Sequence, residues 1–483
     1  MATEYVHPLL RRSKDIEAMV PYWEKVDAIV EGETAIKQEA KKFLPMFPDE
    51  TDTDYRFRLS LSKFTNIYRD VLEGLAHKPF EEEVTLIKAE GAEVPQEIKD
   101  FCEDVDGSGN SLTIFSSLSF FNAINNAVEW ILIDYPSVNE SVRTVADVKA
   151  MNIRPFWTHI VAKNVLEVRT EIIGAKEVIS YFRFLEPATT LDSKDCVRVF
   201  ERIGDTVTWT LHEKVDKPAK PEEAFRQIGA GVLSIPLIPV VSFATGRRDG
   251  KSFKYYPPMR DAADLQVVLY QDESALQFVK TMACYPMLAA NGMKPKVNAA
   301  GVPEKISVGP MRVLYGVPDG NGGHGEWKFI EPQANSMEFL QKNIEKTKQD
   351  LRELGRQPLT ALSSQLTTVT TSIAAGKAKS AVTAWALALK DALENALMIT
   401  ALWLKVSYEP QVNVFTGFDN VLDDGKDLEA LDKARERGDL SQETFLFELK
   451  RRKVLSPEFD FEDEQARLLA EIPSEGVDIT NSP

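Results

Sequence analysis

Residues 357–376 contain no Lys, Arg, Asp or Glu, although 27% of the chain is charged. Their polar side chains are hydroxyls and amides, namely Gln357, Thr360, Ser363, Ser364, Gln365, Thr367, Thr368, Thr370, Thr371 and Ser372. A long loop inside a compact domain is usually either functional or disordered. An uncharged hydroxyl-rich loop could contact a polyanion without binding it tightly. A plain surface loop or flap is the alternative, and it is the simpler interpretation of the local pattern alone.

Two other segments invite a ligand-binding interpretation that their spacing does not support. The run that starts at Asp104 and continues through Asp106 to Gly109 begins like a calcium loop, but position twelve, which needs a bidentate Glu, is Phe115. The glycine-rich run 319–325 is not followed by Lys and Ser or Thr, so it is no phosphate-binding loop of the Walker type. We predict a turn in the first case and a hairpin tip in the second.

No residue pattern marks a catalytic or metal centre. The five histidines have no second histidine four residues away and no neighbouring Cys, which argues against zinc binding. They are His7, His77, His159, His212 and His324. A Gly-x-Ser-x-Gly nucleophile elbow is absent, and no pair of carboxylates stands out. The sequence therefore predicts a protein that is not an enzyme and needs no cofactor or metal.

Charge and cysteine content limit the classes of protein that remain. The chain of 483 residues carries 57 basic and 74 acidic side chains, for a net charge of −17. Such a balance argues against tight nucleic-acid binding, which needs clustered Lys and Arg. An acidic wall could still surround DNA and let it pass, although ordinary solubility explains the charge more simply. Three distant cysteines predict a reducing compartment, and we expect neither a signal peptide nor a membrane span.

The elements that would position the tract are mainly helices, with one β-rich region. We predict helices over 16–30, from Thr34 to Leu44, and from Thr51 to Leu75, and a helix from Ser111 leading into a buried strand at 129–135. Residues 156–243 alternate apolar and polar side chains, which predicts an antiparallel β lobe. This combination predicts an α+β fold with two to four domains or lobes.

The second half of the chain contains three long helical patterns. Pro257-Pro258 precedes a predicted helix from Met259 to Tyr285, since proline is well tolerated in a first turn. A β-hairpin is predicted within 305–331, and helices over 336–356 and 377–408 flank the hydroxyl-rich tract. After residue 415 we predict two or three short helices and an acidic tail, with Ser441 capping one of the helices.

The order of these pieces resembles the portal, or head–tail connector, proteins of tailed bacteriophages, particularly podophage and siphophage portals of about this length. The resemblance covers nearly the whole chain and lies in the order and spacing of its parts, none of which is specific alone. The matching parts are Tyr22-Trp23, Phe43-Leu44-Pro45, Tyr55 to Leu59, Phe64-Thr65-Asn66, Asp106 to Gly109, Leu132 to Pro136, Arg154 to Trp157, Ile235 to Pro239, Pro257-Pro258-Met259, Tyr285 to Leu288 and Gly438 to Ser441.

The resemblance implies a portal-type fold with a helical wing, a β-rich clip lobe, a long stem helix and a helical crown-side module at the C-terminus. The implied regions are 1–140 for the first wing part, 141–165 for a first stem segment, 166–255 for the clip, 256–286 for the stem helix, 287–410 for the second wing part and 411–483 for the crown side. The tract then falls at the tunnel loop, 356–376, which projects into a central channel in such proteins, and this placement makes a channel loop the favoured interpretation. Lys377 and Lys379 could add a thin basic ring, or could be part of a solvated helix face.

The resemblance also implies partners and a location. The chain would form a ring, usually of twelve copies, at one capsid vertex of a virion assembled in the host cytoplasm. Double-stranded DNA would pass through it without sequence recognition during packaging and ejection. The terminase large subunit and later a head–tail adaptor would dock on the clip, and the major capsid and scaffolding proteins on the wing. The alternatives are a nucleic-acid-processing enzyme with dispersed acidic metal ligands and another virion ring component, such as a tail adaptor or baseplate ring.

Overall fold

The computed structural model describes residues 5–87, 93–136, 153–190, 192–284, 287–291, 293–294, 317–318, 326–330, 334–354, 368–417 and 426–451, and a few positions from 454 to 467. For 282–284, 287–291, 293–294, 317–318, 327–330, 334–336, 354, 368–380, 426–430 and 451, only the backbone is described. Helices and sheets are mixed, as the α+β prediction requires. The chain forms two compact units, 1–415 and 416–483. No helix in the described part is both long and apolar enough to cross a membrane.

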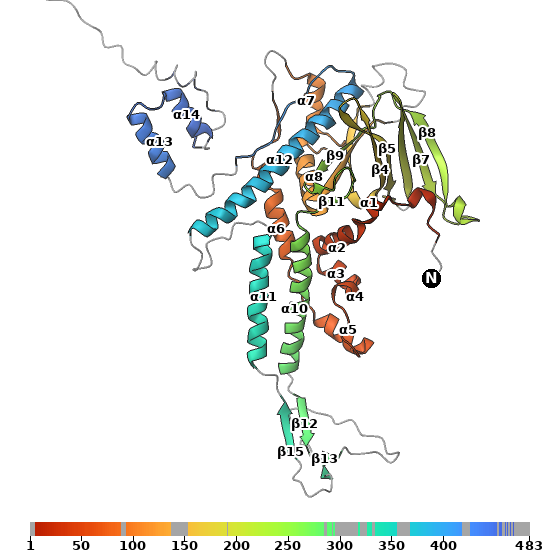
Figure 1. The fold of residues 1–483 in the computed structure, drawn as a ribbon, viewed down its shortest axis with the longest axis vertical. Helices are drawn as coiled ribbons and strands as arrows, with labels where there is room; N and C mark the ends of the chain where they lie inside the picture. Colours follow the sequence, from red (N-terminus) through yellow and green to blue (C-terminus); the bar gives the residue numbers. More distant parts are fainter. Residues whose placement is uncertain are drawn as a thin grey trace, which may run out of the picture. The chain divides into compact units, whose positions relative to one another are not determined.

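The first unit begins with short helices (Figure 1). They are α1 (Lys14–Glu17), α2 (Val20–Glu31), α3 (Glu33–Gln38), α4 (Ala40–Phe43), α5 (Asp52–Leu61), α6 (Ile67–Ala76), α7 (Gln96–Glu103) and α8 (Leu112–Asn126). The prediction of one helix from Thr51 to Leu75 is wrong, because residues 62–66 separate α5 from α6. The helix predicted from Thr34 to Leu44 starts at Glu33 and is divided at Glu39 into α3 and α4. Gly32, whose φ of 98° suits glycine, ends α2 just before it.

The buried end of α8 shows how distant segments complete one another. The last carbonyls of a helix have no partner within it. The hydroxyl of Tyr22 donates to the carbonyl oxygen of Asn125 at 3.0 Å, and the indole Nε1 of Trp23 donates to that of Asn126 at 2.8 Å. These α2 side chains therefore supply hydrogen-bond donors to the last carbonyl groups of α8, just before β2 begins.

A three-stranded antiparallel sheet forms the centre of this unit. Its order is β3 (Phe156–Ile160), β2 (Val128–Asp134) and β9 (Val240–Ala244), with Ile131 opposite both His159 and Val241. The central strand β2 is buried over nearly its whole length, because α8 and α12 also pack against this sheet. Trp130 and Trp157 are each 1% exposed, which places the core here.

A second, five-stranded antiparallel sheet confirms the predicted β lobe over 165–232, while β3 and β9, at the two ends of the predicted range 156–243, belong to the central sheet. The strands of the five-stranded sheet follow chain order: β4 (Val165–Ile173), β5 (Lys176–Glu186), β6 (Cys196–Ile203), β7 (Thr206–Lys214) and β8 (Phe225–Val232). Short elements complete the unit: η1 (Pro8–Leu10), η2 (Lys78–Phe80), η3 (Ala162–Asn164) and η4 (Pro221–Glu223), and the strands β1 (Thr85–Leu86), β10 (Arg247–Arg248), β11 (Tyr255–Tyr256), β13 (Met293–Lys294), β14 (Val317–Pro318) and β16 (Val412–Asn413).

Three long helices follow in the chain. They are α10 (Arg260–Cys284), α11 (Ala334–Leu354) and α12 (Thr368–Leu404), and the strands β12 (Met287–Asn291) and β15 (Glu326–Ile330) lie in the chain between α10 and α11. The predicted helix over 259–285 is thereby confirmed. In the second unit, α13 (Lys426–Glu436) and α14 (Gln442–Arg451) are described, and the amide of Thr444 donates to the Ser441 hydroxyl at 3.1 Å, which confirms the predicted cap.

Candidate functional site: a two-helix hairpin and the hydroxyl-rich tract

Helices α10 and α11 lie side by side and form a long hairpin (Figure 1). β12 follows α10, β15 precedes α11, and the two strands pair antiparallel from Met287 opposite Ile330 to Asn291 opposite Glu326. The strand pair therefore continues the helix pair at its far end. On α11, the buried residues Ile344, Thr347 and Leu351 recur at helical spacing, which gives this helix one inward face.

One side chain of α10 holds the start of α6. The amide oxygen of Gln266 accepts hydrogen bonds from the backbone amides of Ile67 at 3.0 Å and Tyr68 at 2.9 Å. Its amide nitrogen donates to the carbonyl oxygen of Thr65 at 2.9 Å. First-turn amides lack partners within their own helix. Gln266, which is 0% exposed, therefore caps α6 from a distant part of the chain.

The break between α5 and α6 is fastened to the hairpin at two further points. Glu273 of α10 accepts a hydrogen bond from the amide of Thr65 at 3.2 Å, and its other carboxylate oxygen lies 3.3 Å from Lys348 Nζ of α11. The hydroxyls of Ser62 and Tyr270 lie 3.1 Å apart and share a hydrogen bond. Side chains of α10 therefore bind both backbone groups of Thr65 within this break, while the side chains of Ser62 and Asn66 cap the adjoining ends of α5 and α6.

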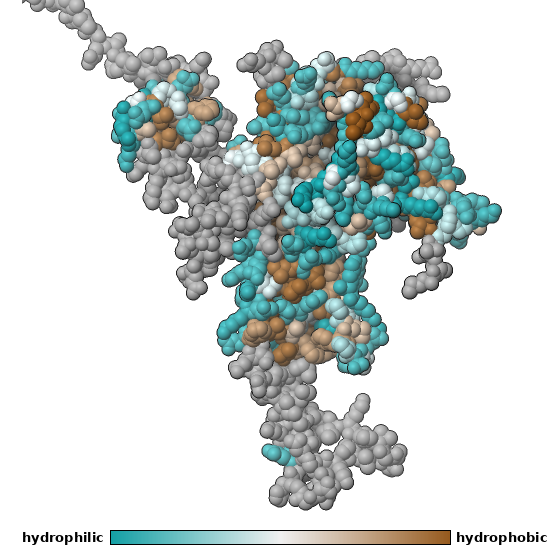
Figure 2. All heavy atoms as spheres, in the orientation of Figure 1, coloured by the Kyte–Doolittle hydropathy of each residue, from teal (hydrophilic) through white to brown (hydrophobic). Residues whose placement is uncertain are grey.

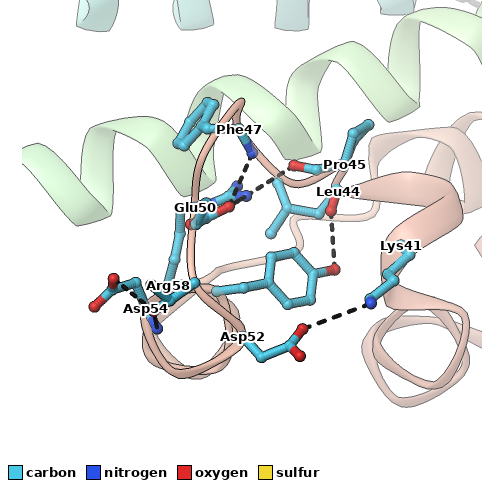
Figure 3. Close-up of polar contacts among 10 residues, drawn as sticks. Lys41, Leu44, Pro45, Phe47, Glu50, Asp52, Asp54 and Arg58 are labelled. Carbon is cyan, nitrogen blue, oxygen red and sulfur yellow. Dashed lines mark hydrogen bonds and ion pairs between the residues drawn. The ribbon is translucent and has the colours of Figure 1, made fainter.

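A buried ion pair braces the segment that leads into α5 (Figure 3). Arg58 donates from Nε and Nη2 to the two carboxylate oxygens of Glu50, each at 2.8 Å, and from Nη2 to the carbonyl oxygen of Pro45 at 2.8 Å. The side chains of Arg58 and Glu50 are 3% and 8% exposed. The guanidinium also lies 4.1 Å from the ring centre of Phe47. The Arg58 hydrogen bonds lower the pKa of the Glu50 carboxyl, so the pair is charged at neutral pH.

The hairpin exposes apolar side chains as well as charged ones. Phe339 on α11 is 74% exposed and Val268 on α10 is 43% exposed. Figure 2 shows apolar patches among hydrophilic side chains on the visible face of this region. Large exposed apolar groups often mark contacts with another protein.

The hydroxyl-rich tract is described only in its second half. Gln357, Thr360, Ser363, Ser364, Gln365 and Thr367 lie outside the described residues. Thr368, Thr370, Thr371 and Ser372 form the first turns of α12, and Lys377 and Lys379 follow in the same helix. The prediction of a loop as far as Gly376 is therefore wrong after Thr367. Hydroxyl residues are tolerated at a helix start, and no proline interrupts the run into the Ala/Leu-rich segment.

The remaining ligand-like motifs are structural in the described residues. Asp106 accepts a hydrogen bond from the amide of Ser108 at 2.9 Å, and Asp104 accepts one from Arg154 at 2.6 Å, which confirms the predicted turn. His159 lies against the buried carboxylate of Glu129 at 3.3 Å. No cluster of potential metal ligands occurs among the described residues. The glycine-rich run 319–325 lies outside them.

Sequence patterns did not reveal the side chains that hold the hairpin in place. Gln266, Glu273 and Arg58 are polar residues within helices, and each looks like an ordinary surface residue in the sequence. The one available signal was Gln266 itself, which falls on the apolar side of the α10 pattern, where a polar residue needs a hydrogen-bond partner.

Comparison with known proteins gives one family match and several distant structural likenesses. A family model described as a domain of unknown function (DUF4055) matches residues 258–404, which span α10, α11 and α12. No curated protein matches the chain. The chain is similar to a chain in the neck of the native gene transfer agent (GTA) particle computed with C12 symmetry, at 11% identity and a TM-score of 0.41, covering 79% of this chain and 89% of that one.

Two further likenesses come from the same kind of particle. One is to a chain of the virion of the native gene transfer agent particle, at 10% identity and a TM-score of 0.38, covering 87% of this chain and 94% of that one. The other is to a chain in the neck of the empty GTA particle computed with C6 symmetry, at 11% identity and a TM-score of 0.41, covering 78% and 87%. Scores this low establish no shared fold.

Proposed function

We propose that this chain is the portal protein of a tailed bacteriophage: a non-enzymatic ring at one capsid vertex through which DNA is packaged and ejected. The observation that carries the proposal is the α10–α11 hairpin, which ends in the β12–β15 strand pair and is fixed to the rest of the unit by buried polar contacts. A rigid helix pair repeated around an axis can form the wall of a channel.

The hairpin leads us to propose a different division of the chain from the one that the resemblance implies. We assign the stem to α10 and α11 together, and the clip to the segment between them, which contains β12 and β15. The five-stranded sheet of 165–232 then belongs with the wing helices, to which the N-terminal segment ties it: the amide of Ser13 donates to the carbonyl oxygen of Leu166 at 2.9 Å. This division replaces the expected clip at 166–255.

Ring formation needs one surface of each copy to meet a different surface of the next. The exposed Phe339 and Val268 on the hairpin are suited to such a contact, because burying them removes apolar area from water. Terminase and then the adaptor would dock on the clip, while capsid and scaffolding proteins would contact the wing. This chain would leave the ATP chemistry of packaging to terminase.

The hydroxyl-rich tract and the start of α12 would line the channel in this proposal. Hydroxyl and amide side chains can form brief hydrogen bonds to phosphate, and they release no counterions, so they would not hold the duplex in place. Lys377 and Lys379, which follow in α12, would add a narrow basic ring when repeated by symmetry.

Negative-stain electron microscopy of the purified full-length chain, assembled with its capsid and scaffolding partners if needed, tests the proposal. We expect rings with a central hole and a mushroom-shaped side view. Particles that are solid at the centre would rule the proposal out. A tail adaptor or baseplate ring would lack the mushroom profile, and metal-dependent cleavage of DNA by the purified chain would favour the nuclease alternative.

A further inference from the structure

The hairpin formed by β10 and β11 is a basic segment in an acidic protein. Residues 247–256 contain four basic side chains and one acidic side chain, whereas the whole chain has a net charge of −17. The strands pair antiparallel, with Arg247 opposite Tyr256 and Arg248 opposite Tyr255. Successive residues of a strand point to opposite sides. The hairpin therefore has an inner face with Arg248 and Tyr255, and an outer face with Arg247 and Tyr256.

Contacts on the inner face hold the hairpin in one conformation. Arg248 makes a two-pronged ion pair with Glu177 of β5, both hydrogen bonds being 2.9 Å, and donates to the carbonyl oxygens of Ser252 and Lys251, each at 2.8 Å. The Arg248 hydrogen bonds hold the pKa of the Glu177 carboxyl down at about 2, so this pair remains charged at neutral pH. Tyr255 is 5% exposed. Arg248 therefore serves the fold and is not available to a ligand.

A close backbone contact fixes where the hairpin starts. A Cβ on Gly246 would lie 2.7 Å from the Cβ of Ala127 and 2.9 Å from the carbonyl oxygen of Tyr256. The amide of Gly246 donates to the carbonyl oxygen of Ala127 at 2.9 Å. Position 246 therefore has room for glycine alone, and the hairpin is locked against the end of α8.

The outer face places cations around one exposed aromatic ring. The guanidinium carbon of Arg247 lies 5.2 Å from the ring centre of Tyr256, and Lys254 Nζ lies 5.6 Å from it. Tyr256 is 37% exposed, and Lys251 is exposed at the turn. Within the described part of the chain, Arg247, Lys251 and Lys254 make no ion pair. Two carboxylates lie near these cations: Asp249 accepts a hydrogen bond from the Tyr256 hydroxyl at 3.2 Å, and Glu177, which is paired with Arg248, interacts electrostatically with Lys251.

We infer that the outer face of the β10–β11 hairpin, formed by Arg247, Lys251, Lys254 and Tyr256, binds the phosphate backbone of duplex DNA. Unpaired cations are what a polyphosphate ligand attracts, since each phosphate contact releases counterions. The cations around the Tyr256 ring leave its face less available for stacking on a base, which favours backbone contact over recognition of unpaired bases. The inference rests on the proposed function for the choice of DNA as the polyanion, and it names a contact separate from the hydroxyl-rich tract.

A duplex fits this surface better than an anionic membrane does. Phe253 and Tyr255 of the hairpin are 9% and 5% exposed. The exposed ring is that of Tyr256, which is flanked by Arg247 and Lys254 and has its hydroxyl bound to Asp249, so the hairpin presents no exposed aliphatic group to a bilayer. Membrane-surface elements normally present exposed apolar groups beside their basic ones. Three cations on each copy would give weak contacts to one duplex, which suits a strand that must move past.

The test measures binding of the full-length chain to a fluorescent duplex of about 30 base pairs, at roughly 50 and 200 mM salt, by anisotropy. The variant carries Arg247→Gln, Lys251→Gln and Lys254→Gln. Each lost phosphate contact lowers the slope of log affinity against log salt by about one. We expect the variant to lose at least tenfold in affinity at the lower salt and up to about three units of slope. The matched control carries Lys99→Gln, Lys217→Gln and Lys220→Gln, exposed cations away from the hairpin, and should bind within about twofold of the wild type.

The inference is overturned if the wild type does not bind the duplex at the lower salt, or if the variant and the control lose the same affinity. It is also overturned if the variant still binds DNA but no longer binds vesicles of anionic phosphatidylglycerol. Circular dichroism of the variant is expected to match that of the wild type, because the three substituted side chains are on the outer face. Electron microscopy separates this inference from the proposed function. Rings without hairpin-dependent DNA binding would contradict the inference alone, and hairpin-dependent binding without rings would contradict the portal proposal alone.

Discussion

At the scale of single residues, the Arg58–Glu50 pair shows how polar groups outside any catalytic site can determine a local structure. Its two side chains are 3% and 8% exposed, and Arg58 also holds the carbonyl oxygen of Pro45 at 2.8 Å (Figure 3). Removing one partner of a buried pair leaves an uncompensated charge. We expect Glu50→Gln to lower the free energy of unfolding by about 3 kcal/mol, measured by urea denaturation followed by circular dichroism.

The pH dependence of this loss follows from the direction of the pKa shift. The Arg58 hydrogen bonds lower the pKa of Glu50 in the folded state, so its contribution to stability is fully present above the unfolded pKa of roughly 4.3. The contribution disappears as pH falls through the folded pKa. The wild type and Glu50→Gln should therefore become closer in stability below about pH 4. The control is Glu338→Gln, which removes the exposed pair with Lys342 and should change stability by at most about 0.5 kcal/mol.

At the scale of elements, the break between α5 and α6 depends on contacts with α10. Replacing Gln266 by Met keeps the side-chain volume but removes the acceptor of the Tyr68 amide, the shorter of two hydrogen bonds from the Ile67 amide, and the donor to the carbonyl oxygen of Thr65. We expect a loss of about 3 kcal/mol in stability, since each buried unpaired group costs about 1–3 kcal/mol. Hydrogen exchange at the amides of Ile67 and Tyr68 should become faster, and mass spectrometry of the peptide that contains them measures the change.

The same substitution at a neighbouring glutamine provides the comparison. Gln271 donates one hydrogen bond, to the carbonyl oxygen of Phe43 at 2.9 Å, so Gln271→Met should cost only about 1 kcal/mol and leave exchange at residues 67 and 68 unchanged. Equal effects of the two substitutions would show that Gln266 does not act as a cap for α6.

Local signals in the sequence predicted those elements whose ends are set by nearby residues. Ser111 caps α8, Ser441 caps α14, and the alternating pattern after residue 156 gives the β lobe. The break at 62–66 was missed although Ser62 and Asn66 cap the adjoining helix ends, because the apolar pattern continues across it and the contacts of Gln266 and Glu273 that hold it lie about two hundred residues away. The true start of α12 was missed because a hydroxyl-rich run looks like a loop, although the first turns of a helix also accept such residues. A short window does not contain the contacts from α10.

At the scale of the whole molecule, the proposed portal would guide DNA without retaining it. An acidic protein repels phosphate over most of its surface, and an uncharged tract provides a neutral contact. The basic outer face of β10–β11 would then be a local exception, with few cations per copy. Weak contacts repeated around a ring can keep a duplex centred, because no single contact is strong enough to stop its movement.

The final prediction changes the tract from neutral to acidic. Replacing Thr367, Thr368, Thr370 and Thr371 by Glu should leave folding intact. The last three positions are at the N-terminus of α12, where the helix dipole interacts favourably with carboxylates. Ring assembly should persist in electron micrographs. Repeated around the channel, the added carboxylates repel phosphate, so the amount of DNA packaged or retained per particle should fall. Replacing the same four residues by Ser keeps hydroxyls and should preserve packaging. If the Glu variant packages and holds as much DNA as the wild type, the tract does not line the channel.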